Sequence, residues 1–159
     1  MPEETGDTYE ANARIKAEAA ARHTGVLSLG DDSGIEVDAL AGAPGIRSAR
    51  FGEPGLDDRG RVRHLLALIA HVPDAQRTAR FRCVIALAAA DGSVRTVEGA
   101  CEGRVAREPR GTGGFGYDPV FFYPPLGRTF GELTDDEKAK VSHRGLAAAA
   151  ARSVLIARA

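Results

Sequence analysis

The feature that most constrains this fold is a pair of apolar segments on either side of Asp91-Gly92. Residues 81–90 precede the dipeptide and residues 93–101 follow it. Asp-Gly favours a two-residue β-hairpin turn, because such a turn needs positive φ angles that glycine adopts without strain. The sequence therefore predicts two adjacent antiparallel strands, against which the rest of the chain has to pack.

A helix is predicted on the N-terminal side of the hairpin, over the alanine-rich residues 8–23. Asp7 and Glu10 have the spacing of a capping box at its start, and Gly25 can end it. Apolar side chains at helical spacing predict a second helix over residues 62–69. Both helices precede the hairpin in the chain.

Short apolar pieces lie between these two helices, at residues 26–30 and 35–37. They surround Asp-Asp-Ser-Gly, so the pattern predicts a strand, a tight turn at residues 31–34 and a second strand. Residues 41–55 are rich in Gly and Pro, which predicts an ordered loop.

Two more helices are predicted near the C-terminus. Thr134 and Glu137 make a second capping box, and Ser142 can cap a terminal helix over residues 143–158. The order of helices and strands indicates a mixed α/β fold. The length suits a single domain over residues 1–159.

Composition excludes several classes of protein. The net charge is -1 with 27% charged residues, so the chain lacks the single-sign field of a nucleic-acid or membrane-surface binder. No apolar run reaches the ~20 residues of a membrane span, and the N-terminal segment does not resemble a signal peptide. We expect a soluble, cytoplasmic protein in which Cys83 and Cys101 are reduced core thiols.

Four carboxylates could bind a hard cation: Glu3 and Glu4 before the first helix, and Asp31 and Asp32 at the predicted turn. Mg²⁺ needs only one or two protein carboxylates when substrate phosphates and water complete its coordination. The same residue types are also typical of solvated N-termini and ordinary turns. Spacing alone leaves both interpretations open.

Basic residues could clamp a polyphosphate. Lys16, Lys138, His143 and Arg144 lie on predicted helices or at their starts, where a helix N-terminus adds unpaired N–H donors. Scattered basic residues can equally face water. The chain has 18 arginines but only three lysines, which suggests that a retained lysine is needed as lysine.

An aromatic pair, Phe115 and Tyr117, lies in the glycine-rich residues 108–118. Such a pair can stack on a base, or it can fill a corner of the core. The glycines allow the backbone to approach a ligand closely or simply permit sharp turns.

Taken in chain order, these segments resemble the inosine triphosphate pyrophosphatases, a family that removes non-canonical purine nucleotides. The resemblance is carried by EETGDTYEANARIKA, DDSGIEVDALAGAPGIRSARF, REPRGTGGFGYDPVFF and ELTDDEKAKVSHRG, at residues 3–17, 31–51, 107–122 and 132–145. These four motifs are distributed along most of the chain, from residue 3 to residue 145.

The resemblance implies an elongated α/β fold with a central mixed β-sheet, a nucleotide cleft between two lobes, and a homodimer. It also implies Mg²⁺-dependent hydrolysis of ITP, dITP and XTP to the monophosphate and pyrophosphate. Positioning and charge neutralisation dominate such phosphoryl chemistry.

The same resemblance assigns roles to residues. Asp32 is the implied catalytic carboxylate, as proton acceptor or metal ligand. Glu3 is the implied second metal-linked carboxylate, with Glu4 as the alternative. The implied substrate-binding residues are Lys16, Ser33, Phe115, Gly116, Tyr117, Asp118, Lys138, His143 and Arg144.

Arg144 offers a physical account of base choice. Hypoxanthine and xanthine present a 6-keto acceptor, whereas adenine presents a 6-amino donor, and a guanidinium can only donate. A site built from Arg144, alone or with a protonated His143, would reject adenine because two donors would face each other.

The family normally begins with a strand and a phosphate-binding Ser/Thr-x-Asn-x-x-Lys motif, which this sequence lacks. We therefore expect the chain to be N-terminally incomplete, with in-frame coding sequence upstream of Met1. Two other interpretations stay open: a non-catalytic nucleotide-binding remnant, and a Maf-like pyrophosphatase acting on modified pyrimidine triphosphates.

Overall fold

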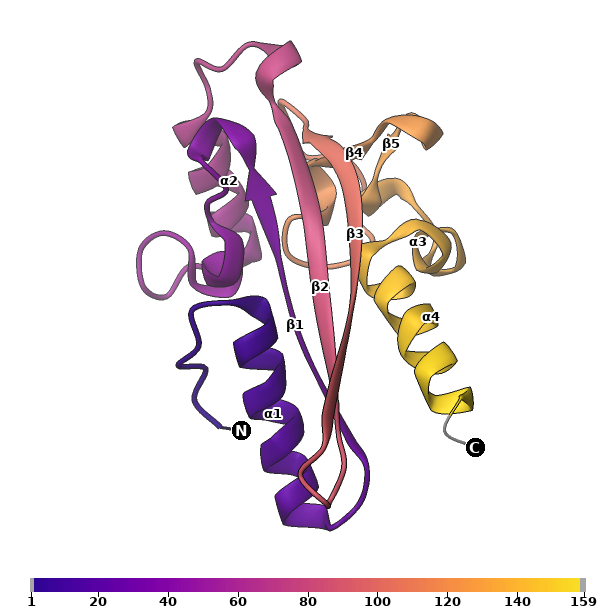
Figure 1. Cartoon of the computed structure of the whole chain (residues 1–159). Helices are drawn as coiled ribbons and strands as arrows, with labels where there is room; N and C mark the ends of the chain where they lie inside the picture. Colours follow the sequence, from indigo (N-terminus) through magenta and orange to yellow (C-terminus); the bar gives the residue numbers. More distant parts are fainter. Residues whose placement is uncertain (1, 158–159) are drawn as a thin grey trace. The chain divides into compact units, whose positions relative to one another are not determined.

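The computed structural model describes residues 2–157, which form helices and one five-stranded sheet (Figure 1). The strands lie in the order β1-β2-β3-β4-β5, and the β3–β4 and β4–β5 pairs are antiparallel. None of the helices described is long and apolar enough to cross a bilayer. The elements are α1 (Tyr9–Thr24), β1 (Ser28–Val37), α2 (Asp58–Leu68), β2 (Thr78–Ala88), β3 (Val94–Val105), β4 (Phe121–Tyr123), β5 (Arg128–Thr129), α3 (Asp135–Val141) and α4 (His143–Ile156). The predicted α/β fold is confirmed.

The chain folds as two compact units, each made of separate segments. Unit 1 comprises Met1–Ser33, Arg82–Ala100 and Ser142–Ala159. Unit 2 comprises Gly34–Phe81 and Cys101–Val141. The residues with implied functions are divided between the two units, so each unit is described by itself.

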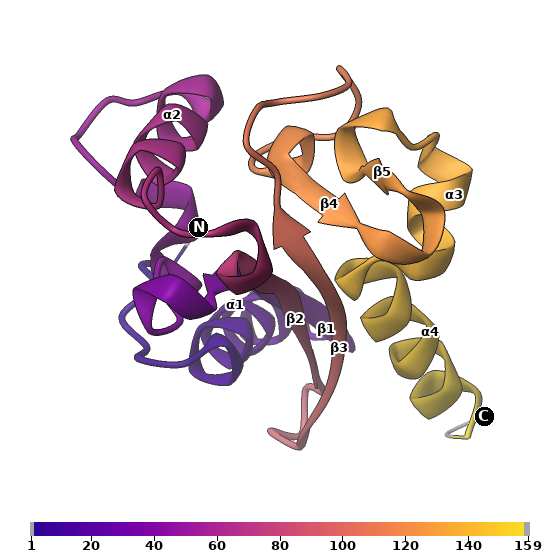
Figure 2. The same ribbon diagram turned by 90° about the horizontal axis from the view of Figure 1, so that it is seen from above.

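Two helices cover unit 1's part of the sheet, α1 on one side and α4 on the other (Figure 2). Helix α1 lies so close to β1 that a Cβ added at Gly30 would be 2.6 Å from the Ala17 backbone nitrogen. Helix α4 packs its small residues on β2, in an apolar cluster that buries Cys83, Ile85 and Leu87. These contacts fix α1 and α4 against β1 and β2.

The core of unit 2 is built around three phenylalanine rings. The centroid of Phe121 is 4.5 Å from that of Phe81 and 4.8 Å from that of Phe130. Helix α2 adds Leu65, and its C-cap residue is Ile69; both side chains are fully buried. Aromatic burial of this kind supplies much of the apolar area that a small unit needs.

The strand prediction around Asp-Asp-Ser-Gly was wrong. No turn occurs at residues 31–34, because β1 runs without a break from Ser28 to Val37. Gly34 is a residue of β1, where a Cβ would lie 2.2 Å from the Gly45 carbonyl oxygen, so the position has no room for a side chain. Glycine within a strand often marks such a close backbone approach, and local sequence cannot distinguish this from a turn.

The predicted hairpin is confirmed, but its loop is longer than two residues. Ala89 N donates to Ser93 O at 2.9 Å, so the loop consists of the three residues between them. Gly92 adopts φ 86°, as the last residue of a three-residue hairpin loop often does. The short strands β4 and β5 were not predicted, because two or three residues carry no readable alternation.

Most predicted helix ends are confirmed. Gly25, at φ 72°, ends α1, and Ser142 Oγ accepts a hydrogen bond from Gly145 N at 3.0 Å at the start of α4. The N-cap of α1 is Thr8 rather than Asp7, because the Thr8 hydroxyl is the group that accepts from the backbone.

The second capping box is also confirmed, since Thr134 and Glu137 exchange side-chain-to-backbone hydrogen bonds. Helix α4 ends at Ile156, and the predicted end at Arg158 lies outside the described residues.

Candidate active site

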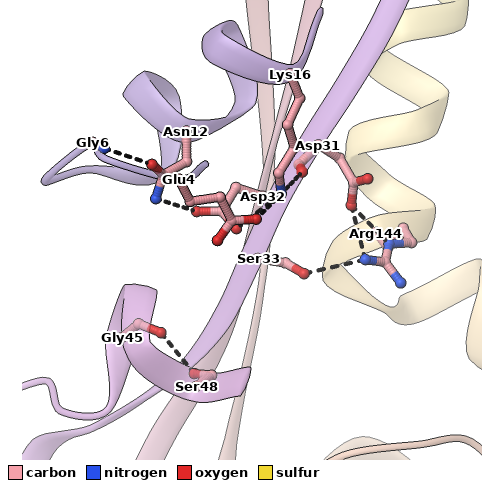
Figure 3. A network of polar contacts seen from close by, with 10 residues as sticks. All are labelled: Glu4, Gly6, Asn12, Lys16, Asp31, Asp32, Ser33, Gly45, Ser48 and Arg144. Atoms are coloured by element: carbon pink, nitrogen blue, oxygen red, sulfur yellow. Dashed lines mark hydrogen bonds and ion pairs between the residues drawn. The ribbon is translucent and has the colours of Figure 1, made fainter. Parts of the chain in front are cut away.

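Strand β1 sends two consecutive acidic side chains to opposite faces of the sheet. Because side chains alternate along a strand, Asp32 points toward α1 and Asp31 points toward α4 (Figure 3). Asp32 is buried, with 8% of its surface exposed, whereas Asp31 stays partly accessible. The acidic pair of the sequence therefore belongs to two different clusters in unit 1.

The Asp32 carboxylate is held by residues of α1 (Figure 3). Asn12 Nδ2 donates to Asp32 Oδ2 at 3.1 Å, and Lys16 Nζ lies 3.6 Å from Asp32 Oδ1. Lys16 also donates to the Asp31 carbonyl oxygen at 2.8 Å and pairs with Glu4 Oε1 at 2.6 Å. One ammonium therefore lies between two carboxylates.

Asn12 is a residue of this cluster that the sequence analysis missed. It is fully buried, and its Oδ1 accepts a hydrogen bond from Gly6 N at 2.9 Å. The side chain thus connects the N-terminal segment to Asp32. One signal was available: Asn12 and Lys16 are four residues apart, which places both on one helix face.

Burial raises the pKa of Asp32 above its ordinary value, because a carboxylate removed from water is less stable when charged. The hydrogen bond from Asn12 and the charge of Lys16 oppose this rise, whereas the charge of Glu4 adds to it. A raised pKa makes the ionised carboxylate a stronger proton acceptor, which suits a general base.

Glu4 and Asp32 are two carboxylates of unit 1 that share the Lys16 ammonium as a partner. No group of three or more His, Cys, Asp or Glu that could hold a metal occurs in residues 2–157. Mg²⁺ needs only one or two protein carboxylates when phosphates and water supply its other ligands. Glu3 is exposed, whereas Glu4 pairs with Lys16, and the metal role implied for Glu3 stays a prediction.

The first turn of α4 carries the second cluster of unit 1. Arg144 NH2 donates to Asp31 Oδ2 at 2.8 Å, and its Nε donates to the same oxygen at 3.2 Å. The same NH2 lies 3.3 Å from Ser33 Oγ. His143 is 6% exposed, so Arg144 is the more accessible of the two basic residues.

Unit 2 holds a separate cluster around Lys138. The Lys138 ammonium forms a close ion pair with Asp118, and it lies 4.8 Å from the centroid of the Phe115 ring. Asp118 Oδ2 also accepts from Phe115 N at 2.9 Å. Phe115 is 61% exposed, so its ring is accessible to a ligand while its backbone is fixed.

The two aromatic residues of the glycine-rich loop differ in exposure, because Tyr117 is buried and Phe115 is exposed. Tyr117 is buried, its hydroxyl donates to Ser48 O at 2.7 Å, and burial raises its pKa to about 12. Gly116, at φ 59°, donates from its N–H to Asp58 Oδ2 at 2.9 Å. The exposed Phe115 borders a hollow of about 620 Å³ between α2 and this loop. The Tyr117 side chain therefore belongs to the core, and the substrate contact implied for this residue stays a prediction.

Solved structures share this fold. A HAM1 protein from Coxiella burnetii superposes with a TM-score of 0.90 at 42% identity, over 99% of this chain and 81% of that chain. The Staphylococcus aureus Ham1 protein gives a TM-score of 0.92 at 38% identity, with the same coverage of both chains. The chain therefore has the α/β fold of these two proteins.

Sequence comparison leads to the same group of proteins. A dITP/XTP pyrophosphatase of Desulforamulus reducens is 53% identical over 153 residues, which is 96% of this chain and 76% of the relative. The Ham1 family profile matches residues 1–154. The chain belongs to the Ham1 family.

Proposed function

We propose that this protein is a nucleoside triphosphate pyrophosphatase that hydrolyses dITP, ITP and XTP to the monophosphate and pyrophosphate. The observation that carries the proposal is the Asp32 cluster, in which a buried carboxylate is oriented by Asn12 and paired with Lys16. The relative in Desulforamulus reducens is named a dITP/XTP pyrophosphatase, which supports the proposal for dITP and XTP.

The chemistry is an in-line displacement at the α-phosphorus. Water attacks this phosphorus, the bond to the bridging oxygen breaks, and pyrophosphate leaves with the bonding electrons. Asp32 accepts the proton that the attacking water loses, and the hydrogen bond from Asn12 orients its carboxylate. Lys16 and Lys138 are the cations proposed to neutralise phosphate charge.

Glu4 and Asp32 are the residues proposed to hold Mg²⁺, in place of the Glu3–Asp32 pair. When bound, this ion would neutralise phosphate charge and polarise an oxygen ligand. Lys16 keeps the two carboxylates close together, since it contacts Glu4 at 2.6 Å and Asp32 at 3.6 Å. Without a cation, these carboxylates would repel a triphosphate.

The nucleoside contacts proposed here come from several residues. The exposed ring of Phe115 offers a face for stacking, and Arg144 offers donors for a 6-keto group. Ser33, Gly116, Tyr117, Asp118 and His143 complete the proposed substrate-binding set. The proposal also includes a cytoplasmic location, one domain over residues 1–159 and a homodimer.

Pyrophosphate release tests the proposal. The wild-type protein with Mg²⁺ should turn over dITP and XTP much faster than dATP, dUTP or a modified pyrimidine triphosphate. Asp32→Asn should reduce turnover by at least about 100-fold, because the proton acceptor is lost, while nucleotide binding persists. Glu18→Gln, on the exposed side of α1, is the matched control and should retain activity.

Other outcomes point to other functions. Nucleotide binding without any pyrophosphate release would favour a non-catalytic nucleotide-binding protein. A preference for modified pyrimidines would favour a Maf-like pyrophosphatase. Full activity in Asp32→Asn would remove Asp32 from the mechanism.

A further inference from the structure

Asp31 is an acidic residue of β1 that the proposed reaction does not use. Its side chain lies on the face of the sheet opposite to Asp32, and its partner is Arg144 (Figure 3). Its backbone carbonyl accepts from Lys16 on the α1 side. Asp31 therefore contacts Lys16 through its backbone carbonyl and Arg144 through its carboxylate.

The contact geometry fixes the plane of the guanidinium. A single oxygen, Asp31 Oδ2, accepts from Arg144 NH2 at 2.8 Å and from Nε at 3.2 Å. Two N–H groups on one edge, directed at one oxygen, restrict rotation about the end of the side chain. Ser33 Oγ, 3.3 Å from NH2, adds a third contact on the same strand.

The neutral thiol of Cys83 also interacts with Arg144. Cys83, on β2, is fully buried without a disulfide, as predicted, and its thiol interacts with Arg144. Burial raises the pKa of Cys83 to about 11, so the thiol stays uncharged at neutral pH. The guanidinium therefore contacts a carboxylate at Asp31 and an uncharged thiol at Cys83.

Stability does not account for this ion pair. The side chains of Asp31 and Arg144 are 36% and 46% exposed, and ion pairs with that much solvent access contribute little to folding. What the pair does provide is orientation, because a long arginine side chain otherwise samples many rotamers.

We propose that Asp31 is a positioning residue, which holds the Arg144 guanidinium in the orientation that reads the purine base. This inference rests on the proposed function. A fixed donor penalises adenine because its 6-amino donor has to face the guanidinium, whereas a loose arginine can swing away and relieve that penalty. Losing Asp31 should therefore relax selectivity more than it slows turnover.

The test compares kcat/KM for dITP and dATP. Asp31→Asn, which removes the charge at nearly constant volume, should reduce the dITP-to-dATP ratio by about tenfold or more. The kcat for dITP should stay within about threefold of wild type. In an Arg144→Ala background the same substitution should leave the ratio unchanged, because the group that it positions is gone.

A matched control is available in the same unit. Glu98 pairs with Arg82 at 3.0 Å on β3 and β2, and both side chains are exposed. Glu98→Gln should leave the ratio unchanged, and thermal melts of every variant should show that each one is folded.

Three results would overturn the inference: an unchanged ratio in Asp31→Asn, a loss of dITP turnover at constant ratio, or an additive effect in the Arg144→Ala background. The second result would place Asp31 with the phosphate machinery instead. Failure of the proposed function is distinguishable, because the wild-type protein would then release no pyrophosphate from dITP.

Discussion

Replacing Asn12 tests how the Asp32 cluster is held in place. Asn12 is fully buried and makes two hydrogen bonds through its side chain, one from Gly6 N at 2.9 Å and one to Asp32 Oδ2 at 3.1 Å. A hydrogen bond to a charged group contributes about 1.5–3 kcal/mol, and one between neutral groups about 0.5–1.5 kcal/mol. Asn12→Ala should therefore lower the free energy of unfolding by about 2–4 kcal/mol.

The loss should be measurable in two ways. Urea unfolding gives the free energy directly, and for a protein of this size the melting temperature should fall by roughly 4–16 °C. Turnover of dITP should also fall, because Asp32 loses the donor that orients it. Asn12→Leu is the sharper variant, since it keeps most of the volume and removes both hydrogen bonds.

Glu10→Ala is the control on the same helix, where Glu10 is exposed and lies 3.8 Å from Arg14 in a solvent-accessible ion pair. It should change stability by less than about 0.5 kcal/mol. The reasoning would be refuted if Asn12→Leu were as stable as wild type, because the two hydrogen bonds would then contribute nothing.

Three further predictions concern stability. In metal-free protein, the stability of Asp32→Asn relative to wild type should increase as pH rises from 3.8, the ordinary pKa, through the raised pKa of folded Asp32. The reason is that folded wild-type protein binds more protons than the unfolded chain in that window, so wild type loses stability there. Calorimetry that shows a pH-independent difference would contradict this. Gly30→Ala places a Cβ 2.6 Å from the Ala17 nitrogen and should cost about 1–3 kcal/mol in urea unfolding, so a neutral result would show that α1 can move away from β1. Arg77→Met should cost about 3–5 kcal/mol, because the buried guanidinium donates to three backbone carbonyls within 3.1 Å that would lose their donor, and a cost under about 1 kcal/mol would argue against that role.

The fold was predictable where a local signal has one physical meaning. Asp91-Gly92 marked the hairpin, Gly25 ended α1, and Ser142 capped α4. Each of these signals acts through backbone groups only a few residues away, so the sequence contains all the information needed. The predicted loop length of the hairpin was wrong, because Asp-Gly occurs in both two-residue and three-residue loops.

The resemblance identified the implied site residues, but it did not show which of them lie close together. Sequence alone presented Asp31 and Asp32 as one acidic pair, and only the alternation along an unbroken β1 assigns them to α4 and α1 respectively. Likewise, the contact between Glu4 and Lys16 is visible only in the structure.

What the sequence by itself determined is the chemistry available: the carboxylates, the few lysines and the aromatic pair, together with the local signals that begin and end helices. Only the tertiary structure decided that Asn12 orients Asp32, that Asp31 holds Arg144, and that Phe115 is exposed. The physical reason is that these assignments depend on contacts between residues far apart in the chain. Gly30 illustrates this, because only the structure shows that the backbone of α1 leaves no room for a side chain there.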